Sequence, residues 1–190
     1  MSLEDKVKWE NKYKNEINLL SNRPHSIKLD LAIKYTNGKK AIDLACGLGR
    51  NVIHLAKNDF FVEAYDISKT ALDNIDKLKI DNITTKEVDL DSFFPNYIDS
   101  DLVIMTNFLD RKLIRNISTT MKKGSIFFVE TFMNHEINEK KHSNPDFLLS
   151  ENELKTMFIV HFEILDYDVY ENEANEQFRM MKQSIIARKI

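Results

Sequence analysis

The chain alternates between short apolar runs and stretches whose apolar residues recur every three or four positions. The short runs predict buried strands, and the three-to-four spacing predicts amphipathic helices. Strand and helix follow each other in turn, which is typical of an α/β protein with a largely parallel sheet. We predict strands near residues 40–45, 61–65, 84–88, 101–106 and 125–131, with helices between them near residues 50–58, 68–78 and 110–120.

The two ends of the chain depart from this alternation. Helical spacing near residues 4–20 and 25–36 predicts an N-terminal helical cap over residues 1–36. Another helix is expected near 151–158, followed by two long strands, "VHFEILDYDVY" and "FRMMKQSIIARK". A short polar segment separates these strands, so they should pair antiparallel. The loop 133–147 is polar and charge-rich, and we expect it to be long enough to move.

Composition limits the domain organisation and the partners. A chain of 190 residues with 43% hydrophobic content fits one domain with a sizeable core, so we take residues 1–190 as a single domain. The 27 basic and 30 acidic residues leave a formal charge of −3 without a basic stripe, which argues against a folded nucleic acid as partner. The N-terminus is charged, and no stretch approaches about 18 consecutive apolar residues. We therefore expect a cytoplasmic protein without a membrane partner; the oligomeric state stays open.

Two of the four glycines lie in "AIDLACGLGRN", where the first predicted strand meets the next helix. Gly47 and Gly49 lack side chains at this turn, so a ligand can approach the backbone amides closely. A dinucleotide-binding fingerprint would need a third glycine where Val52 stands, and no Walker ending follows. Asp43 on the first strand and Asp66 at the end of the second favour a ligand that has a ribose and no pyrophosphate.

These segments resemble the motifs of class I S-adenosylmethionine-dependent methyltransferases. "DLACGLGRN" is similar to their first motif, "AYDIS" to the acidic loop after the second strand, and "EVDLDSF" to the third motif. The segments "TNFLDRKLIRNISTTMKKGSIFFVETF" and "NPDFLLSENELKTMF" resemble the small bacterial methyltransferases grouped with the tellurite-resistance methyltransferases. The resemblance spans roughly residues 9–190. Ala45 departs from the pattern, because many family members carry a glycine there.

The resemblance implies a doubly wound, Rossmann-like α/β sheet of seven mostly parallel strands, with the last strand antiparallel and helices on both faces. It also implies S-adenosyl-L-methionine as cofactor, S-adenosyl-L-homocysteine as product, and a small-molecule methyl acceptor such as a thiol, a chalcogen oxyanion or a metabolite. The alternative is a non-catalytic module that binds the cofactor without transferring its methyl group. The expected cofactor-binding residues are Asp43, Ala45, Cys46, Gly47, Gly49, Arg50, Asn51, Asp66, Ile67, Ser68, Asp89, Leu90 and Thr106.

Candidate acceptor-binding residues come from the N-terminal cap and from the carboxyl ends of the predicted strands. Methyl transfer from a sulfonium mainly requires alignment and exclusion of water, so we identify no catalytic residue. Arg111 suits an anionic acceptor, or else a salt bridge to Asp110 or Glu130. The candidate substrate residues are Trp9, Tyr13, Arg23, Asn107, Arg111 and Glu130, with Phe108 and Thr131 beside them.

Several of these residues also have a structural interpretation. Asp43 would serve as a cap of the helix that follows it, and Asp66 would stand before the N-cap of the helix after the second strand. Asp89 also fits an ordinary polar loop. Trp9 and Tyr13 lie four residues apart on one helix face, where they either pack in the core or cover the cofactor.

The single cysteine and the five histidines suggest no further chemistry. Cys46 is expected to be a small buried spacer, and one cysteine excludes an internal disulfide. The histidines show no tight metal-ligand spacing along the chain, and we interpret His135 and His142 as solvated residues of a charged loop. We therefore predict no metal site.

Overall fold

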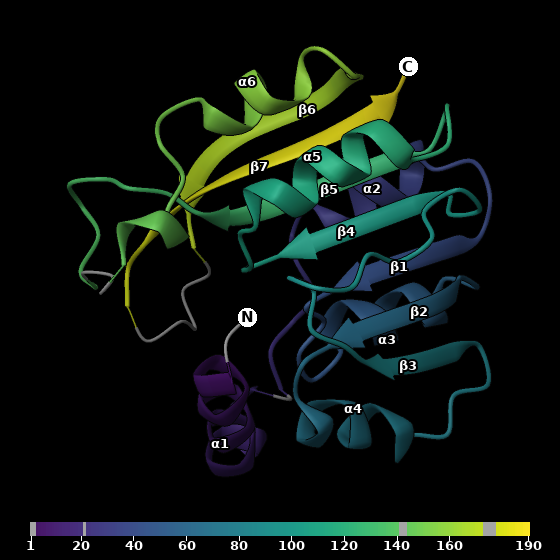
Figure 1. Cartoon of the computed structure of the whole chain (residues 1–190), viewed down its shortest axis with the longest axis vertical. Helices are drawn as coiled ribbons and strands as arrows, with labels where there is room; N and C mark the ends of the chain where they lie inside the picture. The colour runs from purple at the N-terminus through teal and green to yellow at the C-terminus, as the bar shows by residue number, and fades with distance from the viewer. Residues whose placement is uncertain (1–2, 21, 141–143, 173–177) are drawn as a thin grey trace.

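The computed structural model describes residues 3–20, 22–140, 144–172 and 178–190. Seven strands form one sheet in the order β3-β2-β1-β4-β5-β7-β6, with helices on both faces (Figure 1). The strands are β1 (Lys40–Leu44), β2 (Phe61–Asp66), β3 (Ile83–Glu87), β4 (Leu102–Thr106), β5 (Ile126–Phe132), β6 (Phe162–Glu171) and β7 (Met181–Lys189). The helices are α1 (Leu3–Leu20), α2 (Leu29–Tyr35), α3 (Arg50–Lys57), α4 (Lys69–Asp76), α5 (Arg111–Thr120), α6 (Glu153–Phe158) and the short 3-10 helix η1 (Pro145–Phe147).

The pairing of the strands confirms the predicted architecture. Strands β1 to β5 pair in parallel, and β7 runs antiparallel to both of its neighbours, β5 and β6. The strand order reverses direction at β1, so the turn that follows β1 lies at the topological switch point of the sheet. Ligands of open α/β sheets bind at this point, outside the carboxyl ends of the strands.

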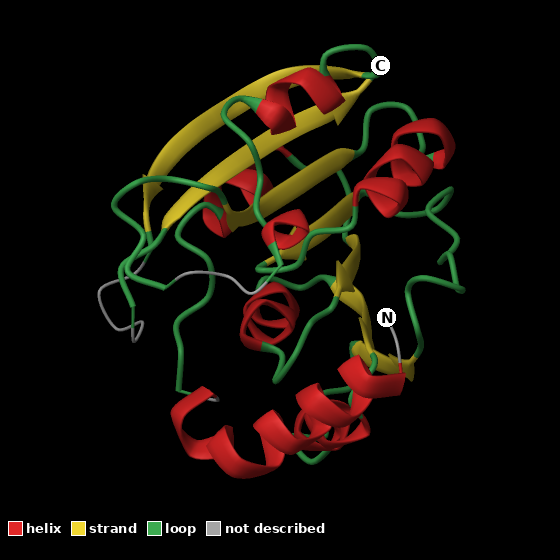
Figure 2. Ribbon diagram, turned by 60° about the vertical axis from the view of Figure 1, so that its left-hand side comes forward, coloured by secondary structure: helices red, strands yellow, loops and turns green. Residues whose placement is uncertain are grey.

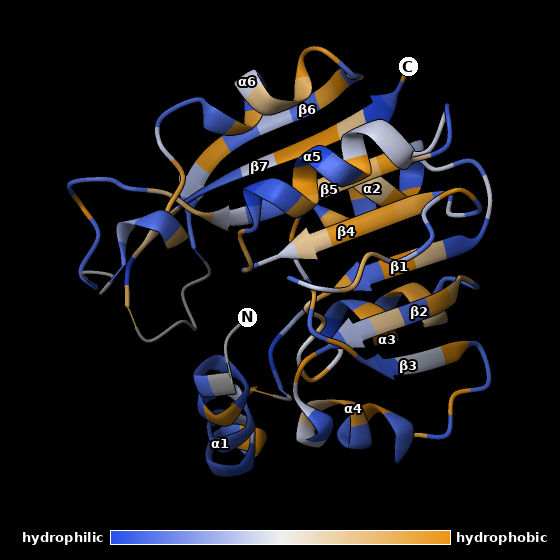
Figure 3. Cartoon of the chain, in the orientation of Figure 1, coloured by the Kyte–Doolittle hydropathy of each residue, from blue (hydrophilic) through white to orange (hydrophobic). Residues whose placement is uncertain are grey.

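Alternate residues of the central strands supply two cores on opposite faces of the sheet. Phe127 and Val129 pack in the core beneath α5 and α6, whereas Ile126 and Phe128 pack in the core beneath α2 and α3. All residues of β4 are buried, as expected for a central parallel strand covered on both sides. Figure 3 shows the same concentration of apolar residues in the central strands.

Helix α1 lies outside these two cores and packs on α4 (Figure 2). Leu20, Tyr13 and Ile17 of α1 share a small cluster with Leu48 and Ala71. The rest of α1 is mostly hydrophilic (Figure 3). Among the residues that the structure describes, none of the helices is long and apolar enough to cross a membrane.

The second helix starts later than its apolar spacing predicts. It begins at Leu29 rather than near residue 25. The backbone amide of Ser26 is bonded to the side chain of Asn51 at 2.9 Å, and Pro24 has no amide proton to give to a helix. Residues 23–28 therefore form a loop that is held against the start of α3.

Candidate functional site

The turn between β1 and α3 takes a backbone conformation that favours glycine. Ala45, Gly47 and Gly49 all have positive φ angles, of 57°, 55° and 81°. The amide of Cys46 donates to the carbonyl of Tyr65 at 3.0 Å, which ties the turn to the end of β2. Ala45 takes the left-handed conformation although it carries a side chain, so the departure from glycine costs strain at this position.

Both glycines are also required by their neighbours. A β-carbon on Gly47 would lie 2.7 Å from the hydroxyl oxygen of Tyr13, and one on Gly49 would lie 2.7 Å from the side chain of Ile75. Gly47 therefore allows α1 to approach the turn, and Gly49 allows α4 to pack beneath it.

Asp66 joins the glycine turn to the loop after β2. Its two carboxylate oxygens accept hydrogen bonds from the amides of Gly47 at 2.8 Å and of Ser68 at 2.9 Å. Burial raises the pKa of Asp66, while these amide donors oppose the shift. Ser68 is itself the N-cap of α4 and accepts from the amide of Ala71. Each carboxylate oxygen of Asp66 keeps a lone pair with which to accept from a ligand hydroxyl.

Asp43 is a buried carboxylate on β1, only 1% exposed. In the part of the chain that the structure describes, neither of its oxygens has a hydrogen-bond partner. Burial raises the pKa of Asp43 well above its ordinary value, and the positive charge of Arg50 opposes this. The interpretation of Asp43 as a helix cap is wrong, since Gly49 is the N-cap of α3 and receives no side-chain cap. An unpartnered buried carboxyl beside the turn is suited to a polar ligand.

Arg50 and Asn51, at the start of α3, hold the loop before α2. Nη1 of Arg50 donates to the carbonyl of Pro24 at 3.0 Å. The Asn51 side chain accepts from Ser26 and donates to the hydroxyl of Thr106 at 2.9 Å. These two predicted cofactor residues thus link α3 to the loop and to the end of β4.

Glu130, at the end of β5, is the centre of a buried polar cluster. It accepts hydrogen bonds from the hydroxyl of Tyr170 at 2.6 Å, from the ammonium group of Lys182 at 3.2 Å and from the hydroxyl of Ser26. Nη2 of Arg50 lies 4.0 Å from the same carboxylate. The side chains of Glu130 and Lys182 are both fully buried, so each charge is compensated by the other and by hydrogen bonds.

Sequence reasoning missed Lys182 and Tyr170. Lys182 pairs with Phe132 across the β5–β7 register and shares its sheet face with Ser184 and Ile186. A lysine on the inward face of an apolar strand was the available signal, because a charged residue at such a position needs a partner.

Arg111 makes a different ion pair from the two considered in the sequence. Its guanidinium binds the carboxylate of Glu153 at 2.5 and 3.0 Å, rather than Asp110 or Glu130. It also donates to the carbonyls of Asp146 and Leu148 at 2.6 and 2.9 Å. Asp110 instead caps α5 through the amides of residues 112 and 113. Arg111 therefore links η1 and α6 to the start of α5. Binding of an anionic acceptor by Arg111 stays a prediction.

Three further candidate residues, Asn107, Trp9 and Arg23, lie just after β4, in α1 and in the loop after α1. Asn107 follows β4 with a φ angle of 55°, and its amide donates to the carbonyl of Glu130 at 2.7 Å. Its side-chain oxygen is buried and, within the described residues, has no hydrogen-bond partner. Trp9 stacks on Tyr13 with ring centroids 5.8 Å apart. Arg23 is half-buried and lies near enough to lower the pKa of Tyr13 by its charge, against a larger rise caused by burial.

The remaining predicted cofactor residues are mainly structural in their contacts. Asp89 follows β3 and accepts from the amide of Asp91 at 3.0 Å, as in the polar-loop interpretation. Leu90 and Ile67 are buried. Cys46 is buried too, and this burial raises the pKa of its thiol well above the ordinary value, in keeping with a spacer.

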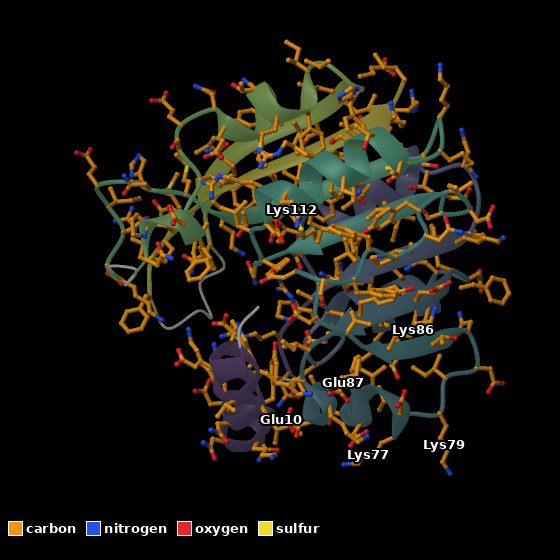
Figure 4. The ribbon with its side chains drawn as sticks, viewed as in Figure 1. Glu10, Lys77, Lys79, Lys86, Glu87 and Lys112 are labelled. Atoms are coloured by element: carbon orange, nitrogen blue, oxygen red, sulfur yellow. The ribbon has the colours of Figure 1, made fainter. Side chains whose placement is uncertain are left out.

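Helix α1 packs over the glycine turn, and hydrogen bonds from α4 to Glu10 hold it there. The carboxylate of Glu10 accepts from the hydroxyls of Ser68 and Thr70, both at 2.5 Å, at the start of α4 (Figure 4). Burial of Glu10 opposes ionisation, but these hydrogen bonds outweigh it and lower the pKa of Glu10 to about 2. Lys6 forms an ion pair with Glu87 of β3 at 2.5 Å.

The described part of the loop 133–147 is hydrogen-bonded to the first residue of β7 and to the segment just before it. The amide of Met133 donates to the carbonyl of Met181 at 2.9 Å, and the side chain of Asn138 accepts from the amide of Met181 at 2.8 Å. Glu139 exchanges two hydrogen bonds with the backbone of Arg179. His142 lies outside the described residues. Closure of this loop over the site stays a prediction.

A shallow apolar groove of about 390 Å³ lies elsewhere, between α5 and α6. Its lining includes Ser118, Met157 and Val160. It belongs to the face of the sheet opposite α3, so it does not contribute to the site at the glycine turn.

Comparison with known proteins places the fold among methyltransferases. The family model described as tellurite resistance protein TehB matches residues 6–181. The crystal structure of TehB from Haemophilus influenzae is similar with a TM-score of 0.77 at 22% identity, over 96% of this chain and 67% of that chain. A S-adenosylmethionine-dependent methyltransferase from Methanosarcina mazei gives 0.67 at 18% identity, over 84% of this chain and 97% of that chain. The cyclase SpnF gives 0.69 at 15% identity, over 95% and 94%. No curated protein matches the sequence.

Proposed function

The chain belongs to the tellurite resistance protein TehB family, and from that premise we propose that it transfers a methyl group from S-adenosyl-L-methionine to a small-molecule acceptor. The fold is that of the S-adenosylmethionine-dependent methyltransferases. The fold alone does not fix the reaction, since the cyclase SpnF shares it. The proposal therefore depends on the residues of the site.

One observation carries the proposal: the carboxylate of Asp66 accepts a hydrogen bond from the amide of Gly47, at the switch point of the sheet. A carboxylate at the tip of the second strand suits the two hydroxyls of a ribose. The glycine turn would offer its backbone to a ligand once Tyr13 moves aside. Asp43 adds a buried carboxyl beside the turn, without a hydrogen-bond partner among the described residues. S-Adenosylmethionine carries a ribose and two positive charges, so these residues fit it.

The cofactor, when bound, supplies a methyl group that its sulfonium already activates. The protein then has to align the acceptor and exclude water. An acceptor that binds as a thiolate, an oxyanion or a carboxylate has already lost its proton and needs no general base, whereas a neutral thiol has to pass its proton to water or to a protein group. We assign ribose binding to Asp66, the amino-acid end of the cofactor to the glycine turn with Asp43, and water exclusion to Tyr13 and the rest of α1.

We assign the acceptor to the space beside the ends of β4 and β5. Support comes from the unpartnered side-chain oxygen of Asn107 and from the buried cluster around Glu130. The net charge of −3 and the absence of a basic stripe in the sequence favour a small acceptor over a nucleic acid. A thiol, a chalcogen oxyanion and a metabolite carboxylate remain the acceptor classes to test.

The proposal is tested by mixing the protein with S-adenosylmethionine and a panel of thiols, oxyanions and carboxylates, and measuring release of S-adenosylhomocysteine. Calorimetry with S-adenosylhomocysteine alone separates binding from turnover. Turnover with one acceptor class, lost in Asp66→Ala, is the expected result. Tight binding without turnover on every acceptor would favour the non-catalytic module, and no binding would overturn both.

A further inference from the structure

Two histidines that are far apart in the sequence meet on the surface beside the candidate site. The rings of His25, in the loop before α2, and His54, in the last turn of α3, stack with centroids 3.5 Å apart and planes 12° from parallel. Asp30, in the first turn of α2, lies against both rings. Its two oxygens lie 2.6 Å from Nε2 of His54 and 3.5 Å from Nε2 of His25.

We propose that His25, Asp30 and His54 form a binding site for a divalent transition-metal ion, with Zn²⁺ as the first candidate. One nitrogen or oxygen atom from each residue lies within 4.8 Å of the other two. Two imidazoles and one carboxylate are the ligand set that such borderline ions prefer, and three protein ligands leave a fourth position for water.

The three ligand atoms already lie close together, and an ion requires one pair to separate and the two rings to turn. Zinc bonds to nitrogen and oxygen of about 2.0–2.1 Å place tetrahedral ligands about 3.3 Å apart. The 3.5 Å separation between Asp30 and His25 already matches this value, and the pair formed by Asp30 and His54 has to open from 2.6 Å. The two rings must also turn out of their parallel stack so that both nitrogens face one ion. The side chains are 30%, 69% and 22% exposed at His25, Asp30 and His54, so an ion can reach them.

A plain hydrogen bond between α2 and α3 explains only part of this arrangement. It accounts for the short contact between His54 and Asp30. It leaves unexplained why the same ring nitrogen of His25 also faces the Asp30 carboxylate, at its other oxygen. A shared ion would account for the convergence of both imidazole nitrogens on one carboxylate, although the parallel stack of the rings has to open for it.

The ion would act on the methyltransferase site through the loop before α2. Pro24 and Ser26 flank His25, and they bind Arg50 and Asn51 of α3. Ser26 also donates to Glu130. An ion that joins His25 to His54 would hold this loop in the position that supports the polar cluster, so we expect it to stabilise the site rather than take part in methyl transfer.

Calorimetric titration of ZnCl₂ into chelator-treated, desalted protein tests the site directly. We expect one equivalent to bind to the unmodified chain, and His25→Ala, His54→Ala and Asp30→Asn each to weaken it. The loss at each histidine should exceed about 100-fold, because even partners of metal ligands are worth about 10- to 100-fold. The half-buried His161 lies outside the cluster, and His161→Ala should bind Zn²⁺ as the unmodified chain does.

A second measurement avoids any dependence on the folding of the variants. Nuclear magnetic resonance of the imidazole nitrogens in the unmodified protein should show one equivalent of Zn²⁺ shifting Nε2 of both His25 and His54 and leaving His161 in place. The thermal unfolding midpoint should rise with Zn²⁺, since a ligand that binds only the folded state stabilises it. Unshifted signals at His25 and His54, or equal Zn²⁺ affinity in the His25→Ala/His54→Ala double variant, would overturn the proposal.

Discussion

The amide of Gly47 donates a hydrogen bond of 2.8 Å to the carboxylate of Asp66, across 19 residues of sequence. The glycine turn after β1 and the acid after β2 are therefore one structural unit. A substitution at either residue changes the backbone that the cofactor would contact as well as the side chain.

Asp66→Ala should weaken S-adenosylhomocysteine binding by roughly 1–3 kcal/mol, the usual value of hydrogen bonds to a charged group. The same change releases the amides of Gly47 and Ser68, so unfolding in urea must be measured beside calorimetry. Asp73→Ala is the matched control, because Asp73 is a partly exposed residue of α4 that forms a surface ion pair with Lys69. Unchanged affinity in a folded Asp66→Ala protein would remove Asp66 from the site.

Gly47→Ala should lower stability by more than Gly124→Ala. Both glycines have positive φ angles, which cost an alanine roughly 1–2 kcal/mol. At Gly124 a β-carbon meets nothing within 4 Å, whereas at Gly47 it meets the hydroxyl of Tyr13 at 2.7 Å. Adding Tyr13→Phe should then recover stability in Gly47→Ala and none in Gly124→Ala. If urea unfolding shows that Gly47→Ala and Gly124→Ala lose the same amount of stability, Tyr13 does not lie against the turn.

The elements and the glycine turn could be predicted from sequence because their signals are local. Val52, Leu55 and Ala56 mark the inner face of α3, and the buried run of β4 has no polar interruption. The order of strand and helix then restricts the sheet to few topologies.

The polar contacts of the site depend on the register and on loop paths, which local patterns do not contain. Glu130 meets Lys182 only because β7 pairs with β5 in one particular register, 52 residues later in the chain. Likewise, His25 meets His54 because the loop before α2 folds back on α3. For this reason, the spacing of the histidines along the chain predicted no metal ligands. For the same reason, the partners predicted for Arg111 were Asp110 and Glu130 rather than Glu153.

Arg111→Met should lower stability by roughly 1–3 kcal/mol and leave cofactor affinity unchanged. The substitution removes the bidentate contact with Glu153 and two hydrogen bonds to backbone carbonyls. Lys112→Met is the control one residue away, since Lys112 is exposed and its ammonium lies 5.6 Å from the ring of Phe94 (Figure 4). If Arg111→Met instead keeps its stability and loses turnover on an anionic acceptor, the guanidinium belongs to the acceptor site.

Docking of α1 should weaken in acid through Glu10. The pKa of Glu10 is lowered from 4.5 to about 2 in the folded protein, so its contribution is complete above about pH 4.5 and is lost as the pH falls toward 2. The contribution is at most about 3 kcal/mol, and less because the carboxylate is partly exposed to solvent. Glu10→Gln should therefore be less stable than the unmodified chain at pH 6, and the difference should shrink to roughly a quarter of that value at pH 2.5, in urea unfolding. A difference in stability that stays constant between pH 6 and pH 2.5 would mean that the ionised Glu10 does not hold α1 against α4.

Helix α1 should open to admit the cofactor and close over it. Tyr13 lies against Gly47, so a ligand at the turn has to displace or rearrange this part of α1. The helix has a suitable hinge, because Glu16 has non-helical backbone angles within it. Closure should exclude water from the proposed methyl transfer, and it should protect the amides of residues 3–15 from hydrogen exchange when S-adenosylhomocysteine binds. Strand β4 serves as the internal control, because its residues are buried and paired with β1 and β5, so its amides should be protected without ligand. Glu10→Ala should speed exchange in α1 before ligand is added. If S-adenosylhomocysteine binds but exchange in α1 stays the same, α1 is a fixed part of the scaffold and water is excluded by another segment.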